Sequence, residues 1–235
     1  MPNESALILV LLPGMDGTGD LFGEFVARFP DWIEPRIVSY PSDLKLSYEQ
    51  LLPIVRSTFP SDEPFVLLAE SFSTPLAVSI VAEAPTHLQA LVICAGFVSP
   101  PCNDFLAAIA RILAPASFSF GMPEKFCRKF LGGEKGSSKL VESVRSAASR
   151  VSPGVLAHRL RSVLSCNSRQ DLSSISVPLL CITGTEDRLV KENCFIEIES
   201  IKPETRRVRI RAPHLILQSS PDESVSALVS FLREV

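Results

Sequence analysis

The sequence predicts an α/β fold with a mostly parallel sheet of about six strands, helices on both faces of the sheet and a helical cap. Short apolar runs alternate with helix-like stretches along most of the chain, which is typical of a parallel sheet covered on both faces. Residues 97–176 contain several helix-like stretches but no strand-like run, and this interval indicates the cap. Three of the apolar runs are followed closely by a serine, an aspartate and a histidine.

The expected elements follow one another in order along the chain. Strands are predicted at residues 6–12, 35–40, 65–70, 89–95, 178–183 and 206–211. Helices are predicted at residues 18–29, 47–59, 74–84, 191–200 and 222–234. Helices of the cap are predicted from Asp104 to Leu113, Pro123 to Leu131, Ser138 to Arg150 and Pro153 to Leu164. Residues 1–96 and 177–235 then form one α/β core, and residues 97–176 form a cap inserted into it.

The pentapeptide Ala69-Glu70-Ser71-Phe72-Ser73 joins a predicted strand to a helix-like stretch. A serine on such a sharp corner is placed as a nucleophile, and small residues two positions before and after it let the chain fold past itself. Glycine is usual at both places, and here they are Ala69 and Ser73. A helix N-cap is the alternative role for Ser71, but two later residues favour the nucleophile.

Asp187 and His214 are those two residues. Asp187 lies in a turn behind the predicted strand 178–183, and His214 follows the last predicted strand. The order Ser71, Asp187, His214, each just past a strand of an alternating chain, is the arrangement expected of an α/β-hydrolase.

Other acids and histidines are rivals for these roles. Glu186 is the nearest alternative acid, but Asp187 stands three residues after Gly184, as the acid usually does in similar chains. His87 lies in a helix-to-strand connection, and His158 lies in a predicted cap helix, where a surface position is the ordinary expectation.

A glycine-rich loop, Pro13-Gly14-Met15-Asp16-Gly17-Thr18-Gly19, follows the first predicted strand. Such a loop can direct backbone N–H groups toward one point. The oxyanion hole of an α/β-hydrolase takes one N–H from the residue after the nucleophile and one from the loop after the neighbouring strand. We assign these two groups to Phe72 and Met15.

Taken together, these motifs make the chain resemble α/β-hydrolases of the carboxylesterase and thioesterase type over nearly its whole length. The loop LPGMDGTG resembles the oxyanion loop of a group of esterase and lipase-like acyltransferase proteins, with Pro13 in place of the commoner histidine. The stretch from His158 to Val190 resembles the pimeloyl-carrier-protein methyl esterases.

The resemblance implies a serine carboxylesterase that works through Ser71, His214 and Asp187 and an acyl-enzyme, without cofactor or metal. A cap of about 80 residues should enclose a modest cavity, which predicts short- to medium-chain acyl esters. A thioesterase or an acyltransferase would use the same groups, and a carrier-protein methyl ester is a further candidate substrate. The alternative from another class is a non-catalytic ligand-binding protein with this fold.

Composition excludes several other classes of protein. A chain of 235 residues with 46% hydrophobic residues and a net charge of −3 indicates an ordinary globular protein and no nucleic-acid partner. The apolar run at residues 6–12 is too short to span a membrane. The six cysteines show no metal-binding or Cys-x-x-Cys spacing, so we expect reduced thiols and a cytoplasmic location.

Charge divides the predicted cap from the predicted core. Residues 97–176 carry eleven Lys or Arg against five Asp or Glu. A basic cap could attract an anionic substrate or an acidic carrier protein, and Arg145, Arg159 and Arg161 are the positions at which charge reversal would test this. Solvated helix faces without a partner are the commoner explanation of such charges.

Overall fold

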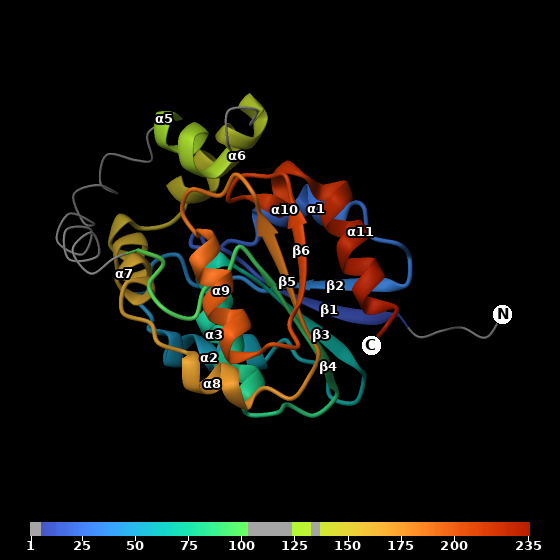
Figure 1. The fold of residues 1–235 in the computed structure, drawn as a ribbon. Coiled ribbons are helices and arrows are strands. Elements are labelled where there is room, and N and C mark those ends of the chain that lie inside the picture. Colours follow the sequence, from blue (N-terminus) through green and yellow to red (C-terminus); the bar gives the residue numbers. More distant parts are fainter. Residues whose placement is uncertain (1–5, 103–123, 133–136) are drawn as a thin grey trace.

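The computed structural model describes residues 6–102, 124–132 and 137–235. Its centre is a six-stranded sheet in the order β2-β1-β3-β4-β5-β6 (Figure 1), and each pair of neighbouring strands is parallel. This sheet confirms the predicted α/β fold. The strands are β1 (Leu7–Leu12), β2 (Ile33–Ile37), β3 (Phe65–Glu70), β4 (Leu88–Cys94), β5 (Leu179–Gly184) and β6 (Arg206–Ile210).

Helices fill the connections between the strands. Outside residues 97–168 the helices are η1 (Asp20–Phe22), α1 (Gly23–Val26), α2 (Tyr48–Arg56), η2 (Ser71–Ser73), α3 (Thr74–Ala82), α8 (Arg169–Ser174), α9 (Glu192–Ile201), α10 (Ile216–Ser219) and α11 (Pro221–Leu232). Between residues 97 and 168 the structure describes α5 (Glu124–Phe126), the π-helical η3 (Cys127–Gly132), α6 (Ser138–Ser149) and α7 (Pro153–Val163). The helix predicted from Asp104 to Leu113 lies outside the described residues.

Several predicted boundaries are wrong, for identifiable reasons. The helix predicted at residues 18–29 begins only at Asp20, because Gly19 before it adopts a left-handed conformation (φ 79°). It consists of the 3₁₀ turn η1 followed by the short α1. Strand β2 begins at Ile33 and includes Pro35. A proline lacks the N–H of a central strand, but β2 lies at the edge of the sheet, where the residue is tolerated. Helices α8 and α10 were not predicted.

Each face of the sheet is covered by its own group of helices. On one face α2, α3, α8 and α9 pack against alternate strand residues such as Ile8 and Val10. On the other face α1, α10 and α11 pack against Leu9 and Leu11. Figure 1 shows the two groups on either side of the strands. Because both faces are buried, the central strands read as continuous apolar runs.

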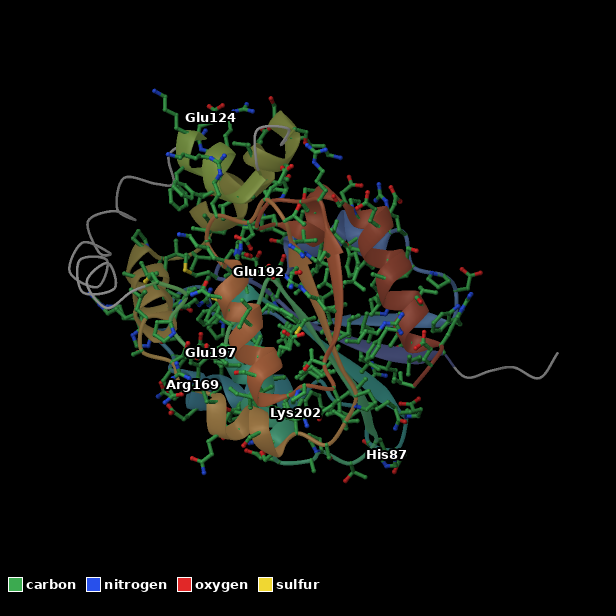
Figure 2. All side chains as sticks on the ribbon, in the orientation of Figure 1. His87, Glu124, Arg169, Glu192, Glu197 and Lys202 are labelled. Carbon is green, nitrogen blue, oxygen red and sulfur yellow. The ribbon has the colours of Figure 1, made fainter. Side chains whose placement is uncertain are left out.

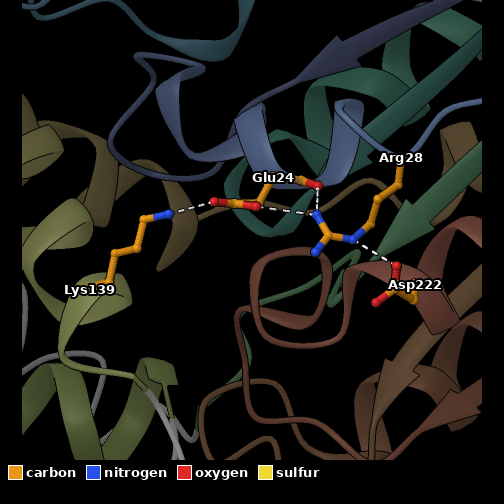
Figure 3. A network of polar contacts seen from close by, with 4 residues as sticks. All are labelled: Glu24, Arg28, Lys139 and Asp222. Atoms are coloured by element: carbon orange, nitrogen blue, oxygen red, sulfur yellow. Dashed lines mark hydrogen bonds and ion pairs between the residues drawn. The ribbon is translucent and has the colours of Figure 1, made fainter.

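The segment that contains α5, η3 and α6 lies above the carboxyl end of the sheet (Figure 1). Its apolar side chains form a small cluster with Leu21 and Leu215 of the core, and the Leu215 N–H donates to the Leu131 carbonyl. A surface network joins the same segment to the core, since Lys139 contacts Glu24, and Arg28 contacts both Glu24 and Asp222 (Figure 3).

The proposed division of the chain at residues 97–176 stays a prediction. Within that interval α8 packs on α3 and α9, and its Leu172 belongs to the main core cluster. None of the helices in the described ranges has the length and apolar character needed to cross a lipid bilayer. A cytoplasmic location likewise stays a prediction.

Candidate active site

Ser71 occupies the corner between β3 and α3. Its φ of 47° is left-handed, a conformation that costs a non-glycine residue about 1–2 kcal/mol. The side chains of Ala69 and Ser73 on either side are fully buried, while Ser71 itself is partly exposed. The tight corner therefore turns the Ser71 hydroxyl outward at the carboxyl end of the sheet.

The structure brings Ser71, His214 and Asp187 together from three separate strand ends. Ser71 Oγ lies 2.9 Å from His214 Nε2, and His214 Nδ1 lies 2.8 Å from Asp187 Oδ2. A carboxylate only accepts hydrogen bonds, so Nδ1 carries the proton and Nε2 is free to accept from Ser71. The side chains of His214 and Asp187 are buried, with 7% and 2% of their surfaces exposed.

The turn after β5 fixes the orientation of Asp187. Its Oδ1 accepts the N–H groups of Leu189 and Val190 at 2.8 and 2.9 Å, which leaves Oδ2 for the imidazole. Gly184 is required where this turn meets the end of β6, because a Cβ at this position would lie 2.5 Å from the Ala212 carbonyl oxygen. The close approach of the two chain segments places Asp187 beside His214.

The rival residues lie elsewhere. Glu186 accepts from Arg211 Nε at 2.9 Å on the surface. His87 is exposed in the loop that enters β4, far from the carboxyl ends of the strands (Figure 2). His158 is half-buried on α7, and its Nε2 has no hydrogen-bond partner among the described residues.

The two residues assigned to the oxyanion hole lie on adjacent strand ends. Met15 follows β1 and Phe72 follows β3, and these strands are paired. The Met15 N–H has no acceptor within the described residues. Phe72 is the second residue of a helical stretch that begins at Ser71, and the first N–H groups of a helix have no intrahelical acceptor. Both groups therefore remain available to a ligand.

Polar side chains tie the two loops to each other. The Ser73 hydroxyl donates to the Pro13 carbonyl, so its oxygen is left to accept from the Tyr40 hydroxyl at 2.7 Å. Tyr48 donates to the Phe72 carbonyl at 2.9 Å. The corner at Ser71 and the glycine-rich loop are consequently held in fixed relation.

Two opposing effects act on the pKa of His214. Burial alone would lower this pKa, because it disfavours the charged imidazolium. The charge of Asp187, its hydrogen bond and the charge of Glu70 act in the other direction and outweigh burial, so the pKa of His214 is raised from its ordinary value. The imidazole is therefore a stronger base than its burial alone would allow.

Glu70 is a buried carboxyl group that the sequence reasoning missed. It is 3% exposed and accepts from Gln218 Nε2 at 3.2 Å, while its Oε1 and the Gln218 Oε1 have no partner among the described residues. Burial raises the pKa of Glu70 to about 7, against a smaller opposing effect of the Gln218 hydrogen bond. The sequence signal for this residue was a single charged side chain at the end of the otherwise apolar strand FVLLAE.

We expect Glu70 to make the protein less stable as pH rises. The unfolded chain ionises near pH 4.5, whereas the folded protein keeps its proton to about pH 7. The unfolded state thus binds fewer protons between these values, and stability falls by about 3 kcal/mol across the window, since one pKa unit is about 1.4 kcal/mol. Urea unfolding at pH 5 and pH 8 should show a larger fall in the wild type than in Glu70→Gln, where only other groups such as His214, whose pKa is also raised, still contribute. Parallel losses in both proteins would contradict the assignment.

Several basic residues of the segment between residues 97 and 176 bind acids of the same chain. Ion pairs join Arg150 to Asp20, Lys139 to Glu24 and Arg169 to Glu197, and Figure 2 shows the last pair between α8 and α9. Arg159, one of the three positions named for charge reversal, is only 2% exposed, so it is unsuited to a test of surface charge. Docking of an acidic carrier protein stays a proposal, and Arg145 and Arg161 are the exposed positions at which to test it.

Two further features of the site region are its side chains of metal-ligating type and the phenylalanines between residues 97 and 132. Within the described ranges, no three His, Cys, Asp or Glu side chains are grouped in a way that could hold a metal ion. Phe97 lies in the main core cluster. Phe126 is 39% exposed and stacks on Phe130 with ring centroids 5.0 Å apart.

Comparison with solved structures shows the same fold in several hydrolases and related proteins. A bromoperoxidase from Bacillus anthracis superposes with a TM-score of 0.83 at 15% identity, covering 97% of this chain and 92% of that one. A hydrolase from Oleispira antarctica gives 0.82 at 11% identity, covering 98% and 92%. An enol-lactonase from Burkholderia xenovorans LB400 gives 0.77 at 17% identity, covering 99% and 94%. At these identities the likeness shows the fold alone.

Comparison of sequences identifies the family. A search of curated proteins finds no significant match. A family model described as serine aminopeptidase, S33, matches residues 40–198, which is more than half of the chain and includes both Ser71 and Asp187. The match confirms the α/β-hydrolase superfamily and indicates a hydrolase. The chain belongs to the serine aminopeptidase S33 family of α/β-hydrolases.

Proposed function

We propose that this hydrolase is a carboxylic ester hydrolase whose catalytic triad is Ser71, His214 and Asp187. One observation carries the proposal: an outward-facing serine at a left-handed corner is hydrogen-bonded to a buried histidine, which is hydrogen-bonded in turn to a buried aspartate. A helix N-cap would require neither the histidine nor the aspartate. This geometry supports nucleophilic catalysis.

In the first half of the reaction Ser71 Oγ attacks the acyl carbon of the ester. His214 Nε2 accepts the proton of the Ser71 hydroxyl as the bond between Oγ and the acyl carbon forms. The π electron pair of the ester carbonyl moves onto the carbonyl oxygen, which becomes the oxyanion. The N–H groups of Met15 and Phe72 are proposed to bind this oxyanion, each worth about 10²–10³ in rate. Collapse of the intermediate breaks the bond to the alkoxy group, which takes the proton from His214.

In the second half water attacks the acyl-enzyme. His214 accepts a proton from the water, and Asp187 stabilises the imidazolium that forms. The proton then returns to Ser71 Oγ as the acid leaves. A thiol acceptor or leaving group would use the same steps, so esterase, thioesterase and acyltransferase activities differ only in what enters the site.

A fluorophosphonate probe tests the proposed nucleophile directly. We expect stoichiometric labelling of the wild-type protein, with the label on the peptide that contains Ser71. A non-catalytic binding protein of this fold would remain unlabelled, and that result would overturn the proposal.

Matched substrates then distinguish the reaction classes. Aryl esters of two to twelve carbons, the corresponding thioesters and an aminoacyl arylamide should be compared at equal concentration, since the family name refers to a peptidase. We expect the highest kcat/KM for oxygen esters of short to medium chain. A preference for the arylamide would replace the esterase proposal with a peptidase, while leaving the triad unchanged.

A further inference from the structure

We propose that Arg159 is a positioning residue for the oxyanion hole, through which α7 holds both halves of that hole in place. The inference rests on the function proposed above. Sequence alone places Arg159 among the charged residues of a helix surface, whereas the structure buries it against the two loops that carry Met15 and Phe72.

The guanidinium group binds three backbone carbonyl oxygens. Its Nη1 donates to the carbonyls of Met15 at 3.0 Å and Asp16 at 2.6 Å, and its Nη2 donates to Pro41 at 2.9 Å. Met15 is the residue whose N–H is assigned to the oxyanion hole. This N–H belongs to the peptide unit before the Met15 Cα and the bound carbonyl to the unit after it. Anchoring the carbonyl therefore limits the backbone rotation at Met15 that would redirect the N–H.

The guanidinium group also lies over the ring of Phe72, the other residue assigned to the hole. Its central carbon lies 5.9 Å from the ring centroid of Phe72 and 5.6 Å from that of Tyr40, distances suited to cation–π attraction. Phe72 supplies the second assigned N–H. A single buried cation from α7 therefore contacts both residues whose N–H groups must converge on one oxygen atom.

The glycine-rich loop is shaped to admit this side chain. Gly17 has a φ of 68°, and a Cβ there would lie 2.4 Å from Arg159 Nη1. The Tyr40 N–H donates to the Gly17 carbonyl at 2.7 Å, so the loop is tied to the segment after β2 beside the guanidinium group. Only a planar, multiply donating cation serves three carbonyls and two ring faces, and lysine cannot replace it fully.

The experiment compares Arg159→Met and Arg159→Lys with Arg233→Met as a control. Arg233 is exposed at the C-terminal end of α11, and its replacement should leave hydrolysis of a short aryl ester unchanged. We expect kcat per folded molecule to fall about 10- to 100-fold in Arg159→Met, with KM within about twofold of the wild type, because a displacement of about 1 Å in a catalytic group can cost that much. The kcat of Arg159→Lys should lie between those of Arg159→Met and the wild type.

A transition-state analogue separates positioning from a purely structural role. A trifluoromethyl ketone forms a hemiketal with Ser71 whose oxyanion occupies the hole, so its inhibition constant should rise by the same factor by which kcat/KM falls. Loss of folded protein would lower the folded fraction measured by circular dichroism but leave both constants per folded molecule intact. If Arg159→Met does not fold, Arg159→Lys carries the test.

Two results would overturn the inference, and they differ. Wild-type kcat and inhibitor affinity in the folded Arg159 variants would remove the positioning role and leave the esterase intact. A wild-type protein that neither hydrolyses esters nor reacts with a fluorophosphonate would remove the proposed function, and the role of Arg159 with it.

Discussion

Replacing Ser71 by alanine is expected to lower kcat for ester hydrolysis by about 10⁴- to 10⁶-fold, because the acyl-enzyme can no longer form. The change should leave the fold intact. Alanine is compatible with the left-handed corner, since Ala95 adopts a φ of 49° in the same protein. Burst kinetics with a p-nitrophenyl ester would measure both the loss of turnover and the loss of the acyl-enzyme burst.

Ser149→Ala provides the control for this change. Ser149 is exposed on α6, and its hydroxyl donates to the Ser146 carbonyl of the same helix, so its removal should leave kcat unchanged. Turnover in folded Ser71→Ala within tenfold of the wild type would show that another group is the nucleophile.

Replacing Asp187 by asparagine is expected to lower kcat by about 10⁴-fold. The amide nitrogen of asparagine would face His214 Nδ1 and donate a hydrogen bond to it. The ring proton would then be on Nε2, and a protonated Nε2 cannot accept the proton of Ser71. The dependence on pH should change as well. In the wild type kcat/KM should rise with pH to a plateau, with a midpoint above that of an unperturbed histidine, because only the neutral imidazole is a base. In Asp187→Asn burial is no longer opposed by this carboxylate, so the midpoint should fall.

Glu186→Gln is the matched control, because Glu186 is the neighbouring acid and binds Arg211 on the surface. Its kcat and its pH midpoint should equal those of the wild type. A large loss of kcat in Glu186→Gln together with a small loss in Asp187→Asn would show that Glu186, and not Asp187, is the acid of the triad.

The parts of the site that sequence could predict are those fixed by strand ends. Ser71, Asp187 and His214 each follow an apolar strand, and in a parallel sheet these ends meet at one edge, so their convergence follows from topology. Glu186 and Asp187 are adjacent, yet the turn geometry that selects one of them depends on backbone N–H groups of Leu189 and Val190. That preference was inferred from spacing after Gly184, and the structure gives its physical cause.

Features that depend on tertiary packing could not be predicted from the sequence. Arg159 lies in a helix whose composition suits the surface, and only the position of α7 against the loop after β1 buries it. Glu70 changes its protonation through burial, which a local pattern does not reveal. Helix α10 is four residues long, too short for a 3.6-residue periodicity to be detected.

Ser73 stands where a search pattern for this class of enzyme would demand glycine. Its hydroxyl forms hydrogen bonds with both the Pro13 carbonyl and the Tyr40 hydroxyl, and glycine could form neither of them. Serine in place of glycine thus adds hydrogen bonds that link the Ser71 corner to the glycine-rich loop and to the segment after β2. Patterns that admit serine together with a distant tyrosine should retrieve related chains that a glycine-only rule passes over.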